Sequence, residues 1–279
     1  MQTISTIDSI ETRQKFEKLV EWFSQFESCI VAFSAGVDSS LLAFAAKKAL
    51  GARSYAVTSH SVSFAESEIE TTHQIANEIG IELISVSQND LARKEYVRNG
   101  VDRCYFCRNN LTEAILPVSE RLRVQVCVEG TQLNDMQSPR PGVKALREAG
   151  FRAPYVELGF GKEEIRAMAK HVGLSNWDRP SEACLSSRIA YGQAIDGATL
   201  IKVEKAEIAV RRITGAKIVR VRTIGLKAIV ELDKEHVSKG LSTRPEIESG
   251  LRALGYGEVE IDREGYVSGK MLSLFIQDS

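Results

Sequence analysis

The fold of this chain is decided by the stretch Cys29-Ile30-Val31-Ala32-Phe33-Ser34-Ala35-Gly36-Val37-Asp38-Ser39-Ser40. Its first five residues are apolar, which predicts a short strand buried on both faces, as in a parallel sheet. Small and polar residues follow, and residues 39–50 predict a helix that stops at Gly51. A tight turn between a buried strand and a helix directs several backbone N–H groups to one point, where the helix dipole adds positive potential. The stretch therefore predicts a polyphosphate-binding loop in an α/β protein.

The loop between this strand and this helix has the side chains that ATP binding needs. Small residues let a polyphosphate approach the backbone, and three serines add hydroxyl donors. Asp38 and Ser39 can cap the helix, and Asp38 can also hold a phosphate-bound Mg²⁺. The residues expected to bind ATP are Ser34, Ala35, Gly36, Val37, Asp38, Ser39 and Ser40. The loop lacks the Lys of a Walker A motif, which disfavours γ-phosphoryl transfer; the alternative is an ordinary capped turn.

Outward from this loop, predicted strands and helices alternate. Helices are expected over residues 11–27, 66–79, 105–122 and 162–172, and strands over 55–58, 81–86 and 124–128. This alternation predicts a parallel sheet with right-handed crossovers. After an irregular segment, 174–196, the order becomes helix 197–213, strands 217–223 and 227–233 as a hairpin, helix 244–254 and strand 257–262. We therefore expect an α/β domain over 1–178, a cysteine-bearing loop or linker over 179–196, and a smaller α+β domain over 197–279 for substrate binding or oligomerisation.

Further polar residues follow the other predicted strands. Ser59 and His60 end the strand at 55–58, and Gly130 and Thr131 follow the strand at 124–128. Ligands of open parallel sheets bind at the carboxyl ends of the strands, so Ser59, Gly130 and Thr131 are expected to join the ATP site. His60 is as consistent with a structural role as with an adenine contact.

Length and composition restrict the class of protein. The chain has 279 residues, 43% of them hydrophobic and 26% charged, and its net charge is −1. This balance gives no global positive field for nucleic acid or for an anionic membrane. We find neither a signal peptide nor a membrane-spanning run, which predicts a cytoplasmic protein whose thiols stay reduced.

The five cysteines fall into two groups. Cys29 and Cys127 lie in apolar strands and are expected to be core residues. Cys104 and Cys107 form a Cys-x-x-Cys at a predicted helix start beside two arginines, a context that favours thiolates and can bind a soft metal. A redox pair or chance spacing is the alternative. Cys184 lies in an irregular, Arg-flanked segment and is expected to be reactive or metal-binding. Three thiolates are too few for a closed zinc site but suit a [4Fe–4S] cluster with one open iron.

The second domain contains a charged pattern. Arg220 and Arg222 are two residues apart on a strand, hence on one face, where they could hold the phosphate of a mononucleotide. Glu231 and Asp233 on the next strand, together with Glu204 or Glu207, could hold a divalent cation. The alternative for these residues is a cross-strand ladder of ion pairs. Ser187 and Arg188, close to Cys184, are expected to contact the substrate.

The phosphate loop resembles the PP-loop, SGGxDS, of the ATP pyrophosphatase superfamily, and the turn at Gly130-Thr131 resembles that superfamily's Gly-Thr-x-x-x-Asp turn. This superfamily has an adenine nucleotide alpha hydrolase-like fold and forms AMP and pyrophosphate. The departure is Ala35, where Gly is usual, and we expect it to be tolerated through a negative φ. Three further segments extend the resemblance over nearly the whole chain: 140–146, 180–188 and 219–222. With them, the sequence resembles the LarE family of ATP-dependent sulfur transferases, which serve nickel-pincer nucleotide synthesis.

The resemblance implies a substrate and a reaction. The carboxylates of pyridinium-3,5-biscarboxylic acid mononucleotide are adenylylated, and sulfur then replaces AMP to give thiocarboxylates. Cys184 matches the family's sulfur-donating cysteine, which becomes dehydroalanine in the sacrificial branch. Cys104 and Cys107 are typical of the branch thought to use a [4Fe–4S] cluster on three cysteines. Family members often assemble as hexamers, so a homo-oligomer is expected.

Three other functions fit parts of the sequence. A tRNA-thiolating PP-loop enzyme combines the same loop with three cluster cysteines but should carry a basic surface, which the net charge disfavours. An amide-forming PP-loop ligase leaves the three cysteines without a role. A regulatory module would bind ATP without releasing pyrophosphate.

Overall fold

The computed structural model describes residues 2–137, 140–180 and 184–267. The chain forms two compact units: described residues 2–61, 66–89, 104–137 and 140–180 make the first, and 62–65, 90–103 and 184–267 make the second. Two short segments from the first half of the chain thus belong to the second unit. The sequence predicts contiguous domains with boundaries at residues 178 and 196. These compact units are divided differently, and the expected domain boundaries stay a prediction. Residues 181–183 of the expected cysteine-bearing segment, and 268–279 of the expected second domain, lie outside the described residues.

A parallel sheet forms the centre of the first unit. Its strands are β1 (Cys29–Ala32), β2 (Ser54–His60), β3 (Glu82–Ser87) and β4 (Val126–Val128), in the order β3-β2-β1-β4. Every pairing is parallel, with Val31 opposite Ala56 and Val128. The helices α2 (Val37–Leu50), α3 (Glu66–Ile79) and α5 (Arg103–Leu122) separate the strands along the chain. The predicted α/β fold with a parallel sheet is confirmed.

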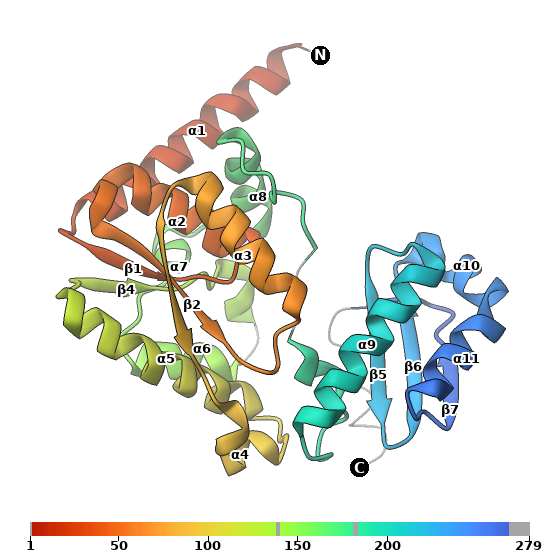
Figure 1. The fold of residues 1–279 in the computed structure, drawn as a ribbon. Helices are drawn as coiled ribbons and strands as arrows, with labels where there is room; N and C mark the ends of the chain where they lie inside the picture. The colour runs from red at the N-terminus through yellow and green to blue at the C-terminus, as the bar shows by residue number, and fades with distance from the viewer. Residues whose placement is uncertain (1, 138–139, 181–183, 268–279) are drawn as a thin grey trace. The chain divides into compact units, whose positions relative to one another are not determined.

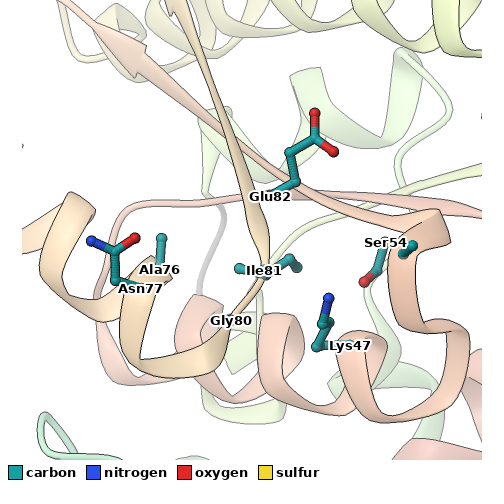
Figure 2. Close-up of a pocket in the computed structure, with 8 residues that line it drawn as sticks. Lys47, Ser54, Ala76, Asn77, Gly80, Ile81 and Glu82 are labelled. Atoms are coloured by element: carbon teal, nitrogen blue, oxygen red, sulfur yellow. The ribbon is translucent and has the colours of Figure 1, made fainter.

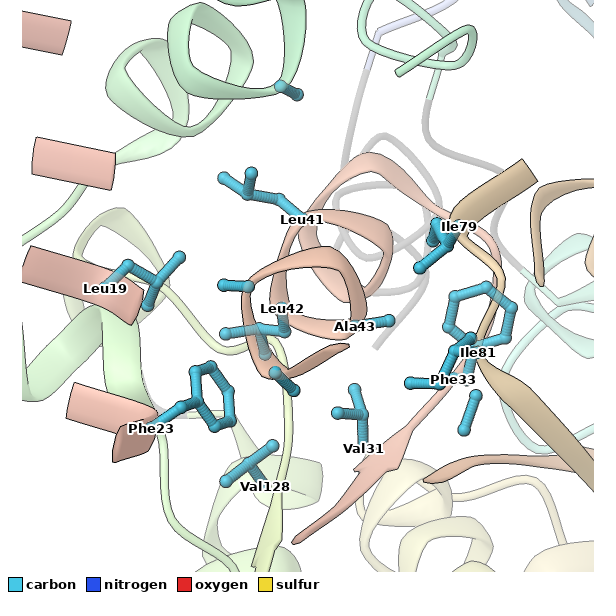
Figure 3. Packing of buried hydrophobic residues seen from close by; sticks show 14 of the residues in the cluster. Leu19, Phe23, Val31, Phe33, Leu41, Leu42, Ala43, Ile79, Ile81 and Val128 are labelled. Atoms are coloured by element: carbon cyan, nitrogen blue, oxygen red, sulfur yellow. The ribbon is translucent and has the colours of Figure 1, made fainter. Parts of the chain in front are cut away.

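Two apolar layers cover this sheet because strand residues alternate between its faces. On one face, Val31 packs in a cluster with residues of α1 (Gln2–Ser24), α2 and α8 (Lys162–His171), as Figures 1 and 3 show. On the other face, Ile30 packs with α5 and α6 (Pro141–Glu148). The sheet is therefore the middle of three layers. Helices cover both of its faces, so the ends of its strands are where a ligand can bind.

The second unit is built around a mixed sheet. It contains α9 (Gly197–Thr214), β5 (Val219–Ile224), β6 (Lys227–Leu232), α10 (Val237–Ser242), α11 (Arg244–Ala253) and β7 (Glu258–Ile261). β5 and β6 form the predicted antiparallel hairpin, and β7 pairs with β6 in parallel. The predicted α+β fold is confirmed here. In the described part of the chain, no helix has the length and apolar character needed to cross a membrane.

Candidate active site

The phosphate loop follows β1 at the carboxyl edge of the sheet. α2 begins at Val37, and its N-cap residue, Gly36, accepts a hydrogen bond from the Ser40 N–H at 2.9 Å. The expectation that Asp38 or Ser39 caps the helix is wrong, because both residues already lie inside its first turn. Ser39 Oγ instead accepts from the Ser34 N–H at 3.2 Å and donates to the Gly36 carbonyl at 3.1 Å. The first N–H groups of α2 have no helical partner and face the loop, as phosphate binding requires.

Ala35 has a left-handed backbone, with φ of +54°. The expected negative φ is therefore wrong. An L-residue pays roughly 1–2 kcal/mol for this conformation because its Cβ crowds the backbone. Asn176 offsets part of this cost, since its side-chain amide donates to the Ala35 carbonyl at 2.8 Å and to Ser40 Oγ at 2.9 Å. Asn176 is buried and was not predicted from the sequence.

Asp38 is held from two sides. Its carboxylate accepts from Lys162 Nζ at 2.6 and 2.8 Å, and its backbone carbonyl accepts from the Tyr155 hydroxyl at 2.7 Å. Burial raises the pKa of Tyr155 well above its ordinary value, so this hydroxyl keeps its proton. Lys162 is a candidate functional residue missed in the sequence, although its place directly after Gly161 at the start of α8 was a usable signal. An ammonium group thus lies beside the loop expected to bind phosphate.

The turn after β4 packs directly on this loop. A Cβ atom on Gly130 would lie 3.1 Å from Asp38 Cβ and 3.4 Å from the Ser39 nitrogen, so the position needs glycine. Thr131 donates to the Glu129 carboxylate through its N–H and its hydroxyl, both at 2.7 Å. Burial raises the pKa of Glu129, an effect that these hydrogen bonds and the charge of Arg108 oppose. The structure therefore brings Gly130 and Thr131 to the phosphate loop.

A hydrogen-bonded chain connects Ser59 to the Cys-x-x-Cys. Ser59 Oγ donates to Gln88 Oε1 at 2.7 Å, and Gln88 Nε2 donates to the Cys107 carbonyl at 3.1 Å and lies 3.7 Å from its sulfur. Ser59 and Gln88 are both buried and end or follow neighbouring parallel strands. The Cys-x-x-Cys therefore lies at the same sheet edge as the phosphate loop.

The five cysteines differ in how exposed they are, and the expectation that Cys29 and Cys127 are core residues is confirmed. Cys104 is exposed, Cys107 and Cys184 are half-buried, and Cys29 and Cys127 are buried. Burial raises the pKa of Cys29 to about 12 and also raises the pKa of Cys127, so both behave as core residues. Cys104 and Cys107 lie near the start of α5, three residues apart, and neither forms a disulfide, so they are a thiol pair that fits a thiolate-bound cluster.

Cys184 precedes a short 3-10 helix, Leu185–Arg188, in the second unit. Arg188, expected to contact substrate, is 1% exposed and forms an ion pair with Glu207 at 2.7 Å. Its Nη1 also donates to the Cys184 carbonyl at 3.1 Å and to the Ser187 hydroxyl at 3.0 Å. Arg188 and Ser187 therefore lie beside Cys184, with the guanidinium engaged inside the protein.

The predicted arginine pair on β5 is buried as well. Arg222 forms an ion pair with Glu231 at 2.8 Å and donates to the Ser187 carbonyl at 3.1 Å. Arg220, opposite Glu231 in register, donates to the Val219 carbonyl and lies over the Tyr266 ring. Oε1 of Glu231 has no hydrogen-bond partner within the described ranges, although the side chain is fully buried.

Asp233 lies apart from Glu231 in its contacts. Its Oδ2 accepts from the backbone N–H groups of Lys217 and Ile218, and its Oδ1 contacts His236 Nδ1. Burial opposes the lowered pKa of Asp233, which these hydrogen bonds produce. Within residues 2–137, 140–180 and 184–267, the group with metal-ligand spacing is Asp233, Glu235 and His236. Glu231 is not a member of this group, and its ion pair with Arg222 matches the cross-strand alternative stated for these residues.

A surface cavity lies elsewhere on the first unit (Figure 2). It has a volume of about 390 Å³ and is lined by the ends of α2 and α3 and the starts of β2 and β3, including Lys47, Ser54 and Glu82. These are the amino ends of the strands. The cavity is therefore at the opposite edge of the sheet from the phosphate loop, and we assign it no part in ATP binding.

Comparison with known proteins gives consistent matches. The sequence pattern of the NAD synthase family matches residues 11–115. The chain is 36% identical over 259 residues to uncharacterized protein slr1717 of Synechocystis sp., covering 92% of this chain and 96% of the relative. It is 29% identical over 254 residues to pyridinium-3,5-bisthiocarboxylic acid mononucleotide synthase of Lactiplantibacillus plantarum, covering 91% and 92%. Together with the phosphate loop at the carboxyl edge of a parallel sheet, these similarities show that the chain belongs to the LarE family of ATP-using PP-loop enzymes.

Proposed function

We propose that this chain is a sulfur transferase that adenylylates the carboxylates of pyridinium-3,5-biscarboxylic acid mononucleotide and converts them to thiocarboxylates in nickel-pincer cofactor synthesis. The name of the Lactiplantibacillus plantarum relative supports this substrate class. The observation that carries the proposal is the chain of contacts from Ser59 through Gln88 to Cys107. It puts a sulfur-bearing motif at the sheet edge where ATP is expected to bind.

The first step is activation of a carboxylate, whose own leaving group, oxide, is too poor for substitution. One carboxylate oxygen attacks the α-phosphorus of ATP, and the bond from that phosphorus to pyrophosphate breaks. The N–H groups at the start of α2 and the Lys162 ammonium would stabilise the charge of the departing pyrophosphate. Asp38 is the residue that would hold Mg²⁺, which offsets the same charge when bound.

The second step is substitution by sulfur. A sulfur nucleophile attacks the acyl carbon, and AMP leaves with the electron pair of its bond to that carbon. If Cys184 is the donor, its thiolate first forms a thioester. Loss of the Cα proton then breaks the Cβ–S bond and leaves a thiocarboxylate on the substrate and dehydroalanine at position 184. This route is balanced without an oxidant or a reductant.

The alternative sulfur source is a [4Fe–4S] cluster held by Cys104, Cys107 and Cys184. Such a cluster would supply sulfide as the nucleophile. The spacing of Cys104 and Cys107, three residues apart on α5 and in no disulfide, supports this assignment. On this route Cys184 is a ligand and survives turnover.

Substrate recognition is proposed for the second unit, through Ser187, Arg188, Arg220 and Arg222 near Cys184, with Glu231 and Asp233 as the proposed acids for a divalent cation. Arginines suit the phosphate of a mononucleotide. We also propose a homo-oligomer. The exposed apolar residues Ile201 and Ile208 support it, since seven residues apart they share one face of α9.

The deciding experiment separates the two half-reactions. Wild-type protein with ATP, Mg²⁺ and the dicarboxylate mononucleotide should yield both pyrophosphate and thiocarboxylate, the latter read by mass spectrometry. The Cys184→Ala variant should still release pyrophosphate but form no thiocarboxylate, whereas the core variant Cys127→Ala should form both. Undiminished thiocarboxylate formation by Cys184→Ala would refute the sulfur role. Pyrophosphate release missing from the wild type would instead favour a regulatory module.

The same samples distinguish the two sulfur sources. Anaerobic purification should give iron and sulfide if the cluster is present, and Cys184 should keep its mass through turnover. A colourless protein that loses the mass of its Cys184 sulfur indicates the sacrificial route.

A further inference from the structure

The backbone of the Cys184 loop is bound by three arginines from three different parts of the chain. Arg188 donates to the Cys184 carbonyl at 3.1 Å, Arg103 to the Ser186 carbonyl at 2.9 Å, and Arg222 to the Ser187 carbonyl at 3.1 Å. All three guanidinium groups are buried. Charged donors bind carbonyls more strongly than neutral ones, so this loop is held far more firmly than an ordinary surface turn.

A side chain on α4 (Lys94–Val97) holds the loop from another direction. The Tyr96 hydroxyl contacts Ser186 Oγ at 2.5 Å, and the two residues are 1% and 0% exposed. Burial raises the pKa of Tyr96 well above its ordinary value, and the charge of a Cys184 thiolate acts in the same direction. The Tyr96 hydroxyl therefore keeps its proton in its contact with Ser186.

Asn99 holds the far end of the same loop. It has a left-handed backbone, with φ of +57°, and its side-chain amide donates to the carbonyls of Ile189, Ala190 and Gln193 at 2.8 to 3.4 Å. Its Oδ1 accepts from Arg103, which also binds Ser186. Strained polar residues with several buried partners persist where the surrounding contacts fix a functional geometry.

We propose that Tyr96, Asn99 and Arg103 are positioning residues that fix the Cys184 loop for sulfur delivery. None of them needs to touch the substrate. They act through the backbone of residues 184–193, and Tyr96 acts through the one hydroxyl that reaches the Ser186 side chain. The role in sulfur delivery rests on the proposed function, whereas the holding of the loop can be measured without it.

The test removes the Tyr96 hydroxyl alone. In Tyr96→Phe, we expect faster amide hydrogen exchange over residues 184–190 and a ratio of thiocarboxylate formed to pyrophosphate released that falls roughly tenfold or more, because small displacements of reacting groups are costly. The matched control is Tyr256→Phe, which breaks a buried hydroxyl pair with Thr223 at 2.9 Å in the same unit. This control should lose comparable stability while keeping the ratio within about twofold.

A double variant separates positioning from fold stability. Tyr96→Phe/Ser186→Ala removes both partners of this contact, so Ser186 no longer leaves a buried hydroxyl without Tyr96, and part of the lost thermal stability should recover. If Tyr96 positions Cys184, the product ratio stays low. A ratio restored together with stability, or unchanged exchange over 184–190 in Tyr96→Phe, would overturn the proposal. If the wild type forms no thiocarboxylate, the proposed function has failed, and hydrogen exchange alone still decides whether Tyr96 holds the loop.

Discussion

The phosphate loop and the Cys184 loop are both irregular segments with proposed roles in the reaction, yet they are stabilised by different groups. Neutral partners hold most of the phosphate loop: serine hydroxyls, the Asn176 amide and the Tyr155 hydroxyl. Buried guanidinium groups hold the Cys184 loop. The groups that bind the phosphate loop leave the first N–H groups of α2 for an anion, whereas the groups that bind the Cys184 loop are donors to its backbone carbonyls. The two half-reactions of the proposed function should therefore depend on separate sets of contacts.

Thiol reactivity gives the largest expected contrast. At pH 8 the Cys29 thiol, with a pKa of about 12, should be about one ten-thousandth ionised, and its burial also blocks reagents. Iodoacetamide should therefore label Cys104, Cys107 and Cys184 well before Cys29 and Cys127, as read by peptide mass spectrometry. Because the raised pKa and the burial of Cys29 both oppose alkylation, its labelling should stay slow for as long as the protein is folded. Equal labelling of Cys29 and Cys184 in folded protein would contradict the assignment of core and site thiols.

Breaking the buried ion pair beside the Cys184 loop should lower the free energy of unfolding of the protein. Arg188→Met leaves Glu207 buried without its cation, a change that costs about 3–5 kcal/mol. Urea unfolding monitors this loss. The control is Arg244→Met, whose partner Glu248 lies in an exposed pair on α11, and it should cost less than about 1 kcal/mol. Similar losses in both variants would show that the Arg188 contacts contribute little.

Removing the Lys162 ammonium group beside the phosphate loop should slow pyrophosphate release, the first of the two proposed half-reactions. Lys162→Met loses a charge-assisted contact worth about 1.5–3 kcal/mol, so kcat/KM for pyrophosphate release should fall roughly tenfold to a hundredfold. Hydrogen exchange over residues 184–190 should not change. Lys170→Met on the same helix serves as the control. A loss of equal size in Lys170→Met would mean that general surface charge, and not the place of Lys162, supports the reaction.

The smallest expected effect concerns backbone strain. Ala35→Gly relieves a left-handed alanine and should stabilise the protein by up to about 1 kcal/mol, after the larger entropy of glycine in the unfolded chain is subtracted. Thermal unfolding measures it. Ala43→Gly, inside α2, is the control and should destabilise by a similar amount. Destabilisation by both changes would show that the Ala35 methyl contributes packing that outweighs its strain.

Most of the fold could be predicted from local patterns in the sequence. The apolar run at 29–33 and the turn after it predicted β1 and the phosphate loop, and alternation predicted the other parallel strands. The partners of that loop could not be predicted, because Lys162 and Asn176 follow it by more than 120 residues along the chain. The φ of Ala35 was wrong because alanine seldom adopts a left-handed backbone. For Glu231 the sequence left two possibilities, a cation site and an ion pair across the hairpin, and the contact with Arg222 matches the second.

The interleaving of the two units has a consequence for how the molecule forms. Residues 90–103 are synthesised about eighty residues before the loop that they hold, and they belong to the second unit. A nascent chain released only as far as Cys184 therefore has Tyr96, Asn99 and Arg103 in place but nothing for them to bind. Contacts over such sequence separations form late and slow folding. Cys184 can thus reach its final environment only after a segment made much earlier has been brought to it, and a cut between residues 103 and 184 would separate the loop from these three side chains.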